Sequence, residues 1–511
     1  MLTVDLVRAG ARRWGARPAL TYRDRTLSFA DVDGLASRMA NALIAGGVRP
    51  GTRVAILADN GPYSLSIDFA CLKARATRVP LNARLSSSEH ARMLAESGAT
   101  VLLYTSSLAD RAAELLAAAD AVDGLSVGPA PHGHPDLLVR AQDGSARDPL
   151  LAATPDDVVL ALFTSGTTGT LKAAQHTQAT YAAVCANILA NLVSPGRDDA
   201  MLHAASLIHA SGTFVLPFWL RGARAVVLDG LDPDAYLEQV RATGATHANL
   251  VPTMITMLLE RGGDADLGRL RSMVYGASPM PRATLERALA TWGPILTQYY
   301  GQTEAPLCLA VLDAEDHVGD DVPYGAAGQP AVDVELRLVD ADGRDVADGE
   351  VGEIAVRGPI VHAGYLDAPE LDAAVRMPDG FMRTRDLGRR DERGFLHLED
   401  RTSDMIVTGG YNVYPREVEE ALVAHPDVVE AAVVGGPDPT WVEAVTAFVR
   451  VRQGAEVDAE ALRSHVRGRV AGYKVPKRVE LVDDLPKSAV GKVLRRALRD
   501  PLWADHDGGG R

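Results

Sequence analysis

The stretch F-T-S-G-T-T-G-T-L-K at residues 163–172 follows an apolar run of strand length, V-V-L-A-L-F at residues 158–163. Between its Phe and its Leu every residue is Thr, Ser or Gly, and Lys172 ends it. Glycines let backbone N–H groups approach a ligand's oxygens, hydroxyl groups add donors, and Lys adds a positive charge. The pattern therefore predicts a buried strand followed by a polyphosphate-binding loop. It is not a Walker loop, because Gly-Lys-Ser/Thr would have to end it.

Four further motifs follow this loop along the chain. They are Y-G-Q-T-E at 300–304, G-F-M-R-T-R-D at 380–386, D-R-T-S-D-M-I-V-T-G-G-Y-N-V-Y-P at 400–415 and L-P-K-S-A-V-G-K-V-L-R at 485–495. Together with the loop they resemble the ordered signature motifs of the adenylate-forming superfamily. That superfamily contains acyl- and aryl-CoA synthetases, stand-alone adenylation domains and luciferases. Five motifs in order over more than three hundred residues argue strongly against coincidence.

The bulk properties limit the class of protein. A chain of 511 residues is too long for one hydrophobic core, so two or more domains are expected. The net charge of −15 argues against a nucleic-acid-binding surface. Three widely spaced cysteines fit neither a disulfide framework nor a zinc cluster, and they favour a reducing cytoplasm.

No membrane-spanning segment is expected. The N-terminal residues lack the apolar core of a signal peptide and predict an amphipathic helix instead. The most apolar long window, residues 201–220, is interrupted by two His residues, a Ser and a Pro. It therefore predicts buried core rather than a membrane span.

The periodicity predicts an α/β fold. In the first half, helical and strand patterns alternate, which favours parallel strands; we expect a helix at 31–45 and strands at 53–57, 101–104, 225–228 and 248–251. After about residue 319, alternating segments and an Asp-Gly turn predict antiparallel strands, at 334–339 and 352–357. The last hundred residues predict an α+β arrangement, with helices at 415–424 and 459–470 and strands at 428–434 and 444–451.

The resemblance implies more about domain organisation. It implies a large N-terminal domain, residues 1–402, of two stacked αβ subdomains and a small β-barrel-like subdomain at about 320–400. A smaller, mobile α+β C-terminal domain, residues 403–511, follows and carries Lys492.

The family's first reaction joins a carboxylate to the α-phosphorus of ATP and releases pyrophosphate. Two anions about 4 Å apart repel each other by roughly 4 kcal/mol at an effective dielectric constant near 20. The site therefore needs cations and N–H donors aimed at the developing charge. By resemblance, the loop wraps the β- and γ-phosphates with Thr164, Ser165, Gly166, Thr167, Thr168, Gly169 and Lys172. Catalytic roles are expected for Lys492, Glu304, Thr164 and His209.

Magnesium and the nucleotide need other groups. Mg²⁺ prefers oxygen ligands, for which the resemblance nominates Glu304 and Thr168. Asp386 resembles the family's ribose-binding Asp, since a carboxylate can accept hydrogen bonds from two hydroxyl groups. The remaining expected nucleotide-binding residues are Gly276, Ala277 and Ser278 along the adenine, Tyr299 stacked on it, Tyr300 near the α-phosphate, Gly301, Gln302 and Thr303 in the same motif, and Arg401.

The acid and the thiol are expected to meet in a second half-reaction, after the C-terminal domain rotates. His209, in S-L-I-H-A-S-G at 206–212, resembles a family residue at the acyl site and its gate. Gly410 is expected to line the path of the coenzyme A thiol, and Lys477, with Lys474 nearby, to meet its phosphates. Two family positions differ here: Arg385 replaces a Gly, and Ser403 stands at the hinge in place of Asp or Lys.

The leading hypothesis is an AMP-forming acid–thiol ligase that uses ATP, Mg²⁺ and coenzyme A. The alternatives are loading of a carrier-protein phosphopantetheine, ATP-dependent activation of nitrite for an aromatic amine, and a non-catalytic ATP-binding protein. The expected partners are a small carboxylic acid and, for the second hypothesis, an acyl carrier protein. We expect a cytoplasmic monomer or homodimer.

Overall fold

The computed structural model describes residues 1–119, 121–164, 172–262, 266–278, 280–319, 321–401, 404–408, 411–438, 441–487 and 492–504. By its internal packing the chain divides into two units. Unit 1 comprises residues 1–336 and 356–382, and unit 2 comprises residues 337–355 and 383–511. The domain division expected at residues 402–403 falls outside the described residues and stays a prediction.

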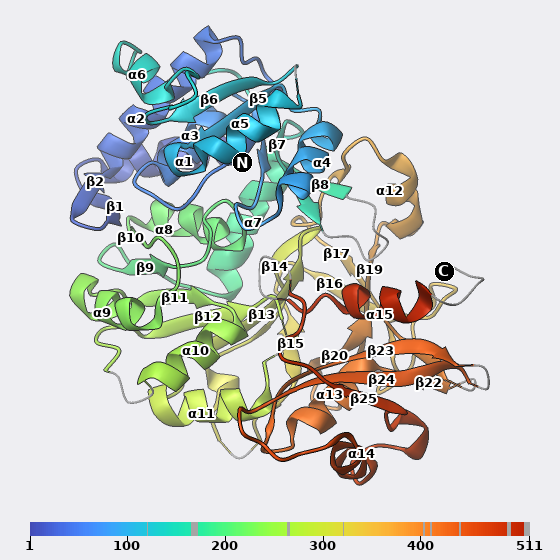
Figure 1. Ribbon diagram of the computed structural model, residues 1–511. Helices are drawn as coiled ribbons and strands as arrows, with labels where there is room; N and C mark the ends of the chain where they lie inside the picture. Colours follow the sequence, from blue (N-terminus) through green and yellow to red (C-terminus); the bar gives the residue numbers. More distant parts are fainter. Residues whose placement is uncertain are drawn as a thin grey trace. The chain divides into compact units, whose positions relative to one another are not determined.

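Within the described residues, unit 1 contains a seven-stranded sheet with the order β18-β8-β7-β4-β3-β5-β6 (Figure 1). Strands β7, β4, β3, β5 and β6 are parallel, and β8 and β18 are antiparallel additions at one edge. The bounds are β3 Arg53–Leu57, β4 Thr77–Pro80, β5 Val101–Thr105, β6 Asp123–Val127, β7 Val158–Thr164, β8 Lys172–Thr177 and β18 Gly364–Tyr365.

A second sheet of unit 1 has the order β15-β14-β13-β12-β11-β9-β10-β1-β2. Its central strands β13, β12, β11, β9, β10 and β1 are parallel. The bounds are β1 Pro18–Tyr22, β2 Arg25–Ser28, β9 Ala200–His203, β10 Arg224–Val227, β11 His247–Leu250, β12 Ser272–Gly276, β13 Leu296–Gln302, β14 Ala305–Leu312 and β15 Ala326–Pro330. The carboxyl ends of these parallel strands form one edge, where ligand-binding residues gather in open α/β sheets.

A shared hydrophobic core joins the two sheets of unit 1. It contains residues of β7 from the first sheet and of β1 and β10 from the second, together with α1 Thr3–Trp14, α2 Phe29–Ala45, α3 Ser64–Lys73, α7 Gln178–Asn191 and α8 Val215–Arg221. Trp219 belongs to this core: its ring centre lies 4.3 Å from that of Phe29 and 4.8 Å from that of Phe69, and its Nε1 donates to the carbonyl of Val7. Burial of such large rings stabilises the packing of one sheet on the other.

Other helices cover the outer faces of unit 1. They are α4 Ser87–Ser97, α5 Ala109–Ala117, α6 Leu137–Gln142, α9 Pro233–Thr243, α10 Pro252–Gly262, α11 Arg282–Trp292 and α12 Pro369–Val375 (Figure 1). Short 3₁₀ helices occur at η1 Ser106–Leu108, η2 Ala210–Phe214 and η3 Glu315–His317. Residues of α9, α10 and α11 form a second core with β9 to β12.

Unit 2 combines antiparallel strands with a small α+β layer. The strands β16 Glu335–Val339, β17 Gly352–Arg357, β19 Met382–Arg390 and β20 Leu396–Arg401 follow one another in one sheet. A five-stranded sheet has the order β22-β21-β24-β23, with β25 paired to β24. Its elements are β21 Ile406–Thr408, β22 Tyr411–Val413, α13 Pro415–Val423, β23 Val428–Asp438, β24 Val442–Val451, α14 Ala459–Arg467, η4 Gly472–Lys474, β25 Arg478–Leu481 and α15 Arg495–Ala504.

The predicted α/β fold is confirmed, with parallel strands early in the chain and antiparallel strands after residue 319. The helix predicted from residue 31 begins at Phe29, because Ser28 and Asp31 form a capping box there. The helix predicted to reach residue 470 ends at Arg467, followed by Gly468. No helix among the described residues is long and apolar enough to span a membrane.

Candidate active site

The Gly/Ser/Thr loop begins and ends on paired strands of unit 1. Strand β7 precedes it and β8 follows it, and Thr164 pairs with Lys172 across the antiparallel register. The predicted strand before the loop is therefore confirmed. Ser165, Gly166, Thr167, Thr168 and Gly169 lie outside the described residues, so their phosphate contacts stay predictions.

Lys172 and Glu304, predicted from motifs that lie far apart in sequence, meet in the fold. Lys172 Nζ donates to Glu304 Oε1 at 2.9 Å and to the hydroxyl of Tyr365 at 2.9 Å. The Tyr365 hydroxyl in turn donates to Glu304 Oε1 at 2.7 Å, and Lys172 Nζ lies 4.5 Å from the centre of the Tyr365 ring. We call these three residues the Lys172 triad. Tyr365 was missed by the sequence analysis, although the pairing of β18 with β8 brings it here.

The Lys172 triad keeps Glu304 ionised. Its side chain is only 7% exposed, and burial alone would raise the pKa of this carboxyl group. The charge of Lys172 and the hydrogen bond from Tyr365 outweigh burial, so the pKa lies below its usual value. An ionised carboxylate is the oxygen donor that Mg²⁺ uses beside substrate phosphates and water. The donor chemistry of Glu304 therefore fits a magnesium ion held largely by the nucleotide.

Two buried histidines hold the backbone around Glu304. The ring Nε2 of His176 donates to the carbonyl of Thr303 at 2.8 Å, and the backbone N–H of His362 donates to the carbonyl of Glu304 at 2.7 Å. Burial lowers the pKa of each imidazole to about 4, so both are neutral near pH 7. Neither histidine was predicted, because a lone His carries no sequence signal of such a contact. Next to them, Gln302 has a buried Nε2 without a partner among the described residues.

The predicted adenine-binding residues lie at the carboxyl ends of β12 and β13. Gly276 pairs with Tyr299 in parallel register. A Cβ atom on Gly276 would lie 2.4 Å from the Tyr299 carbonyl oxygen and 2.7 Å from its ring, so only glycine fits. Ala277 has a φ of 68°, a left-handed conformation that is strained for alanine. Ser278 follows directly.

The Tyr299 and Tyr300 side chains are both buried. Burial raises the pKa of Tyr299 to about 12, and Asn249 Nδ2 lies 3.5 Å from its hydroxyl oxygen. Gly301 is also required by packing, since a Cβ atom there would lie 2.3 Å from the carbonyl oxygen of Leu307. The structure thus brings together Gly276, Tyr299 and Gly301, while their contacts with a nucleotide stay predictions.

His209, the predicted acyl-site residue, lies in the segment between β9 and η2. Burial lowers the pKa of His209 to about 4, and its Nε2 has no partner among the described residues. A neutral imidazole nitrogen can donate to or accept from a polar group of a ligand. This arrangement suits substrate contact better than general acid–base work near neutral pH.

The remaining predicted residues belong to unit 2. Asp386 is buried in β19 and pairs with Arg401 of β20. The N–H of Asp386 donates to Thr384 Oγ1 at 3.2 Å, and Arg385 adopts a φ of 63°. Arg385 therefore adopts the left-handed conformation that glycine favours, at the position where the resemblance places a glycine.

The lysines of unit 2 differ in their surroundings. Lys474 Nζ lies 2.8 and 2.6 Å from the two carboxylate oxygens of Glu417. Lys477 Nζ lies 4.1 Å from the ring centre of Trp441, a side chain that is 41% exposed. Lys492 is exposed and precedes α15. Gly410 and Ser403 lie outside the described residues.

Comparison with known proteins identifies the family. The family model described as AMP-binding enzyme matches residues 7–366, and the one described as AMP-binding enzyme C-terminal domain matches residues 417–492. The chain belongs to the AMP-binding enzyme family. The resemblance to the adenylate-forming superfamily is thereby confirmed, and an acyl-CoA synthetase-like ligase is the class of enzyme that its relatives represent.

Three proteins that this AMP-binding enzyme resembles illustrate the range of activities among its relatives. A feruloyl-CoA synthase from Amycolatopsis sp is 39% identical over 94% of this chain and 95% of its own length. A medium/long-chain-fatty-acid–CoA ligase from Mycobacterium tuberculosis is 34% identical over 98% of this chain and 89% of its own. The solved structure of an amide bond synthetase from Marinactinospora thermotolerans has a TM-score of 0.89 and 32% identity, and it covers 98% of this chain and 99% of that one.

Proposed function

We propose that this AMP-binding enzyme activates an aromatic carboxylic acid with ATP and transfers the acyl group to the thiol of coenzyme A. The observation that carries the activation step is the Lys172 triad beside the Gly/Ser/Thr loop. It holds a cation and an ionised carboxylate, the two kinds of group that a nucleotide polyphosphate and its Mg²⁺ require. An aromatic acid is the first choice because the feruloyl-CoA synthase is 39% identical over nearly the whole chain.

Several roles within this reaction are part of the proposal. Glu304 binds Mg²⁺ together with Thr168, and Asp386 binds the ribose hydroxyl groups. Lys492 neutralises the carboxylate and the phosphate oxygens during adenylation. The region around Gly410 then admits the thiol. These roles follow the family resemblance residue by residue, and the ionised carboxylate of Glu304 supports its part in the proposal.

Coenzyme A is the preferred acceptor because of Trp441 and Lys477. A partly exposed indole ring with an ammonium group 4.1 Å from its centre offers a stacking surface and a positive charge. Coenzyme A carries an adenine ring and a 3′-phosphate, whereas the phosphopantetheine of a carrier protein carries no nucleotide. Lys474 contributes less to this surface, since Glu417 already balances its charge.

The test is a screen that measures AMP, with and without coenzyme A, across ferulate and related cinnamates, benzoates and straight-chain acids. We expect AMP and an acyl-CoA product with aromatic acids, and weaker turnover when pantetheine replaces coenzyme A. Trp441→Ala should raise the KM for coenzyme A but leave the KM for pantetheine unchanged. AMP formation without any acyl-CoA product would overturn the choice of acceptor.

An amine acceptor is the second candidate. It is favoured by the likeness to an amide bond synthetase, which extends over 98% of this chain. The same screen distinguishes it when aromatic and aliphatic amines replace coenzyme A. Amide formation that exceeds thioester formation would favour this second function.

A further inference from the structure

Asn60, between β3 and α3, joins two distant parts of unit 1. Its Nδ2 donates to the carbonyl oxygens of Ala205 and Leu228, each at 3.0 Å. Its Oδ1 accepts from the N–H of Leu207 at 2.9 Å. Both amide N–H donors and one acceptor position are therefore used. Two of these three bonds fix the start of residues 205–212, which we call the His209 segment.

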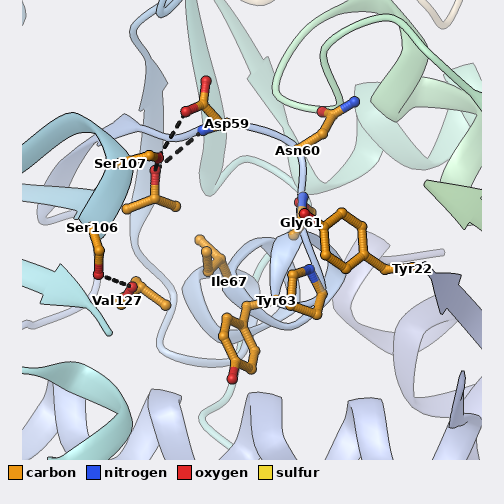
Figure 2. Close-up of a pocket in the computed structure, with 12 residues that line it drawn as sticks. Tyr22, Asp59, Asn60, Gly61, Tyr63, Ile67, Ser106, Ser107 and Val127 are labelled. Atoms are coloured by element: carbon orange, nitrogen blue, oxygen red, sulfur yellow. Dashed lines mark hydrogen bonds between the residues drawn. The ribbon is translucent and has the colours of Figure 1, made fainter. Parts of the chain in front are cut away.

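The backbone next to Asn60 is held by residues at and just after the end of β5. The N–H of Asp59 lies 3.3 Å from Thr105 Oγ1, and Asp59 Oδ2 accepts from Ser107 Oγ at 2.8 Å. Figure 2 shows these two contacts, and it shows the amide of Asn60 directed away from Ser107. A cavity of about 200 Å³ lies beside this stretch and is lined by Tyr22, Tyr63, Ile67, Val127 and neighbouring residues. Asn60 thus follows β3 of the first sheet and bonds to the His209 segment, which follows β9 of the second sheet.

The far end of the His209 segment is fixed independently. Ser211 Oγ lies 2.8 Å from Nδ1 of His203, the last residue of β9. The N–H of Gly212 donates to the carbonyl of His209 at 2.9 Å. A Cβ atom on Gly212 would lie 1.9 Å from the Leu207 carbonyl oxygen, so the segment closes on itself and requires glycine there.

We propose that Asn60 is a positioning residue for acid activation: it sets the location of His209 by holding both Ala205 and Leu207. The inference rests on the proposed function, in which His209 contacts the acyl group. Without these bonds, the start of the His209 segment would be held only by the packing of Leu207 and Ile208 against neighbouring cores, and it would sample more conformations. A group displaced by about 1 Å from its working position can cost roughly 10²-fold in rate.

The experiment compares Asn60→Ala and Asn60→Asp with a matched control, Asn41→Ala. Asn41 also donates to two backbone carbonyls, of Ser145 at 2.8 Å and Arg147 at 2.9 Å, but it holds a surface connection. Asn60→Asp keeps the shape and the bond to Leu207, but it loses both donors and turns a carboxylate oxygen toward the carbonyls of Ala205 and Leu228. Because it leaves no cavity, it serves if the cavity in the alanine variant prevents folding.

Two measurements are made on the full-length chain. Hydrogen exchange should accelerate across residues 205–212 in both Asn60 variants and stay as in the wild type in Asn41→Ala. Pyrophosphate exchange should show kcat/KM for the acid falling by roughly 10²-fold in Asn60→Ala, with a changed ranking of acids and an unchanged KM for ATP. A purely structural role would not lower kcat/KM for the acid while leaving the KM for ATP unchanged.

Unchanged exchange at residues 205–212 in both Asn60 variants would overturn the inference. Faster hydrogen exchange in the Asn60 variants would also overturn it if their kcat/KM for the acid were the same as that of Asn41→Ala. A failure of the proposed function looks different, because the wild type would then form no AMP with any acid. In that case, the hydrogen-exchange comparison still shows whether Asn60 holds the His209 segment, and the role in acid activation falls with the reaction.

Discussion

Removal of the ammonium group of Lys172 tests whether its charge stabilises the buried, ionised carboxylate of Glu304. Lys172→Met keeps most of the side chain's length and apolar stem but removes the ammonium group 2.9 Å from Glu304 Oε1. The two side chains are 16% and 7% exposed, so little water can replace the lost partner. Loss of one member of a buried ion pair costs about 3–5 kcal/mol. We expect a loss toward the lower end of this range at pH 7.5, because Tyr365 still donates to Glu304.

The pH dependence of this loss gives a sharper test. In the wild type the folded pKa of Glu304 lies below its unfolded value. Its contribution to stability is therefore present above the unfolded pKa, near about 4.3, and is lost as the pH falls through the folded pKa. In Lys172→Met burial acts without the opposing charge and raises the folded pKa. Protonation of Glu304 then relieves the cost, so the deficit of the variant should shrink as the pH falls from about 7.5 to about 5.

The assay is urea unfolding at several pH values, followed by tryptophan fluorescence. Trp14, Trp219 and Trp292 lie in unit 1, which contains the triad, and they report on its unfolding, whereas Trp441 and Trp503 report on unit 2. The double variant Lys172→Met/Glu304→Gln should recover most of the loss, because the uncompensated charge is then absent. A stability loss below about 1 kcal/mol at pH 7.5 would refute the reasoning, because a loss of that size is typical of an exposed ion pair. A loss of equal size at every pH would also refute it, because the uncompensated charge of Glu304 would then not be its cause.

Three further predictions concern single residues. Lys492→Ala should lower pyrophosphate exchange by roughly two to three orders of magnitude, as loss of a preorganised donor does, and near-normal exchange would remove Lys492 from its proposed role. Because burial lowers the pKa of His209 to about 4, the KM for the acid should show no step near the usual histidine pKa of about 6.5; a step that disappears in His209→Gln would contradict this. Ala277→Gly should raise the free energy of unfolding by about 0.5–1 kcal/mol, because the left-handed strain at φ 68° exceeds the entropy cost of glycine; a lower urea midpoint would contradict it.

Local patterns predicted much of the fold because they act over short distances along the chain. The apolar run before the Gly/Ser/Thr loop became β7, and the loop returns into β8 at Lys172. Helix α2 begins where Ser28 and Asp31 cap each other, three residues apart. Pairing of strands far apart in sequence leaves no such local signal, so the helices and strands could be predicted more readily than their neighbours in the sheets.

The sequence by itself determined the family, the order of its motifs and the residue types that a nucleotide polyphosphate needs. Only the tertiary structure decided that Tyr365 completes the Lys172 triad, since β18 must pair with β8 to bring it to a lysine 193 positions away. It likewise decided that Asn60 holds residues 205 and 207 and that Gly276 must make room for Tyr299. The physical reason is that hydrogen bonds and steric contacts depend on distance in space, which the packing of two sheets on one shared core creates.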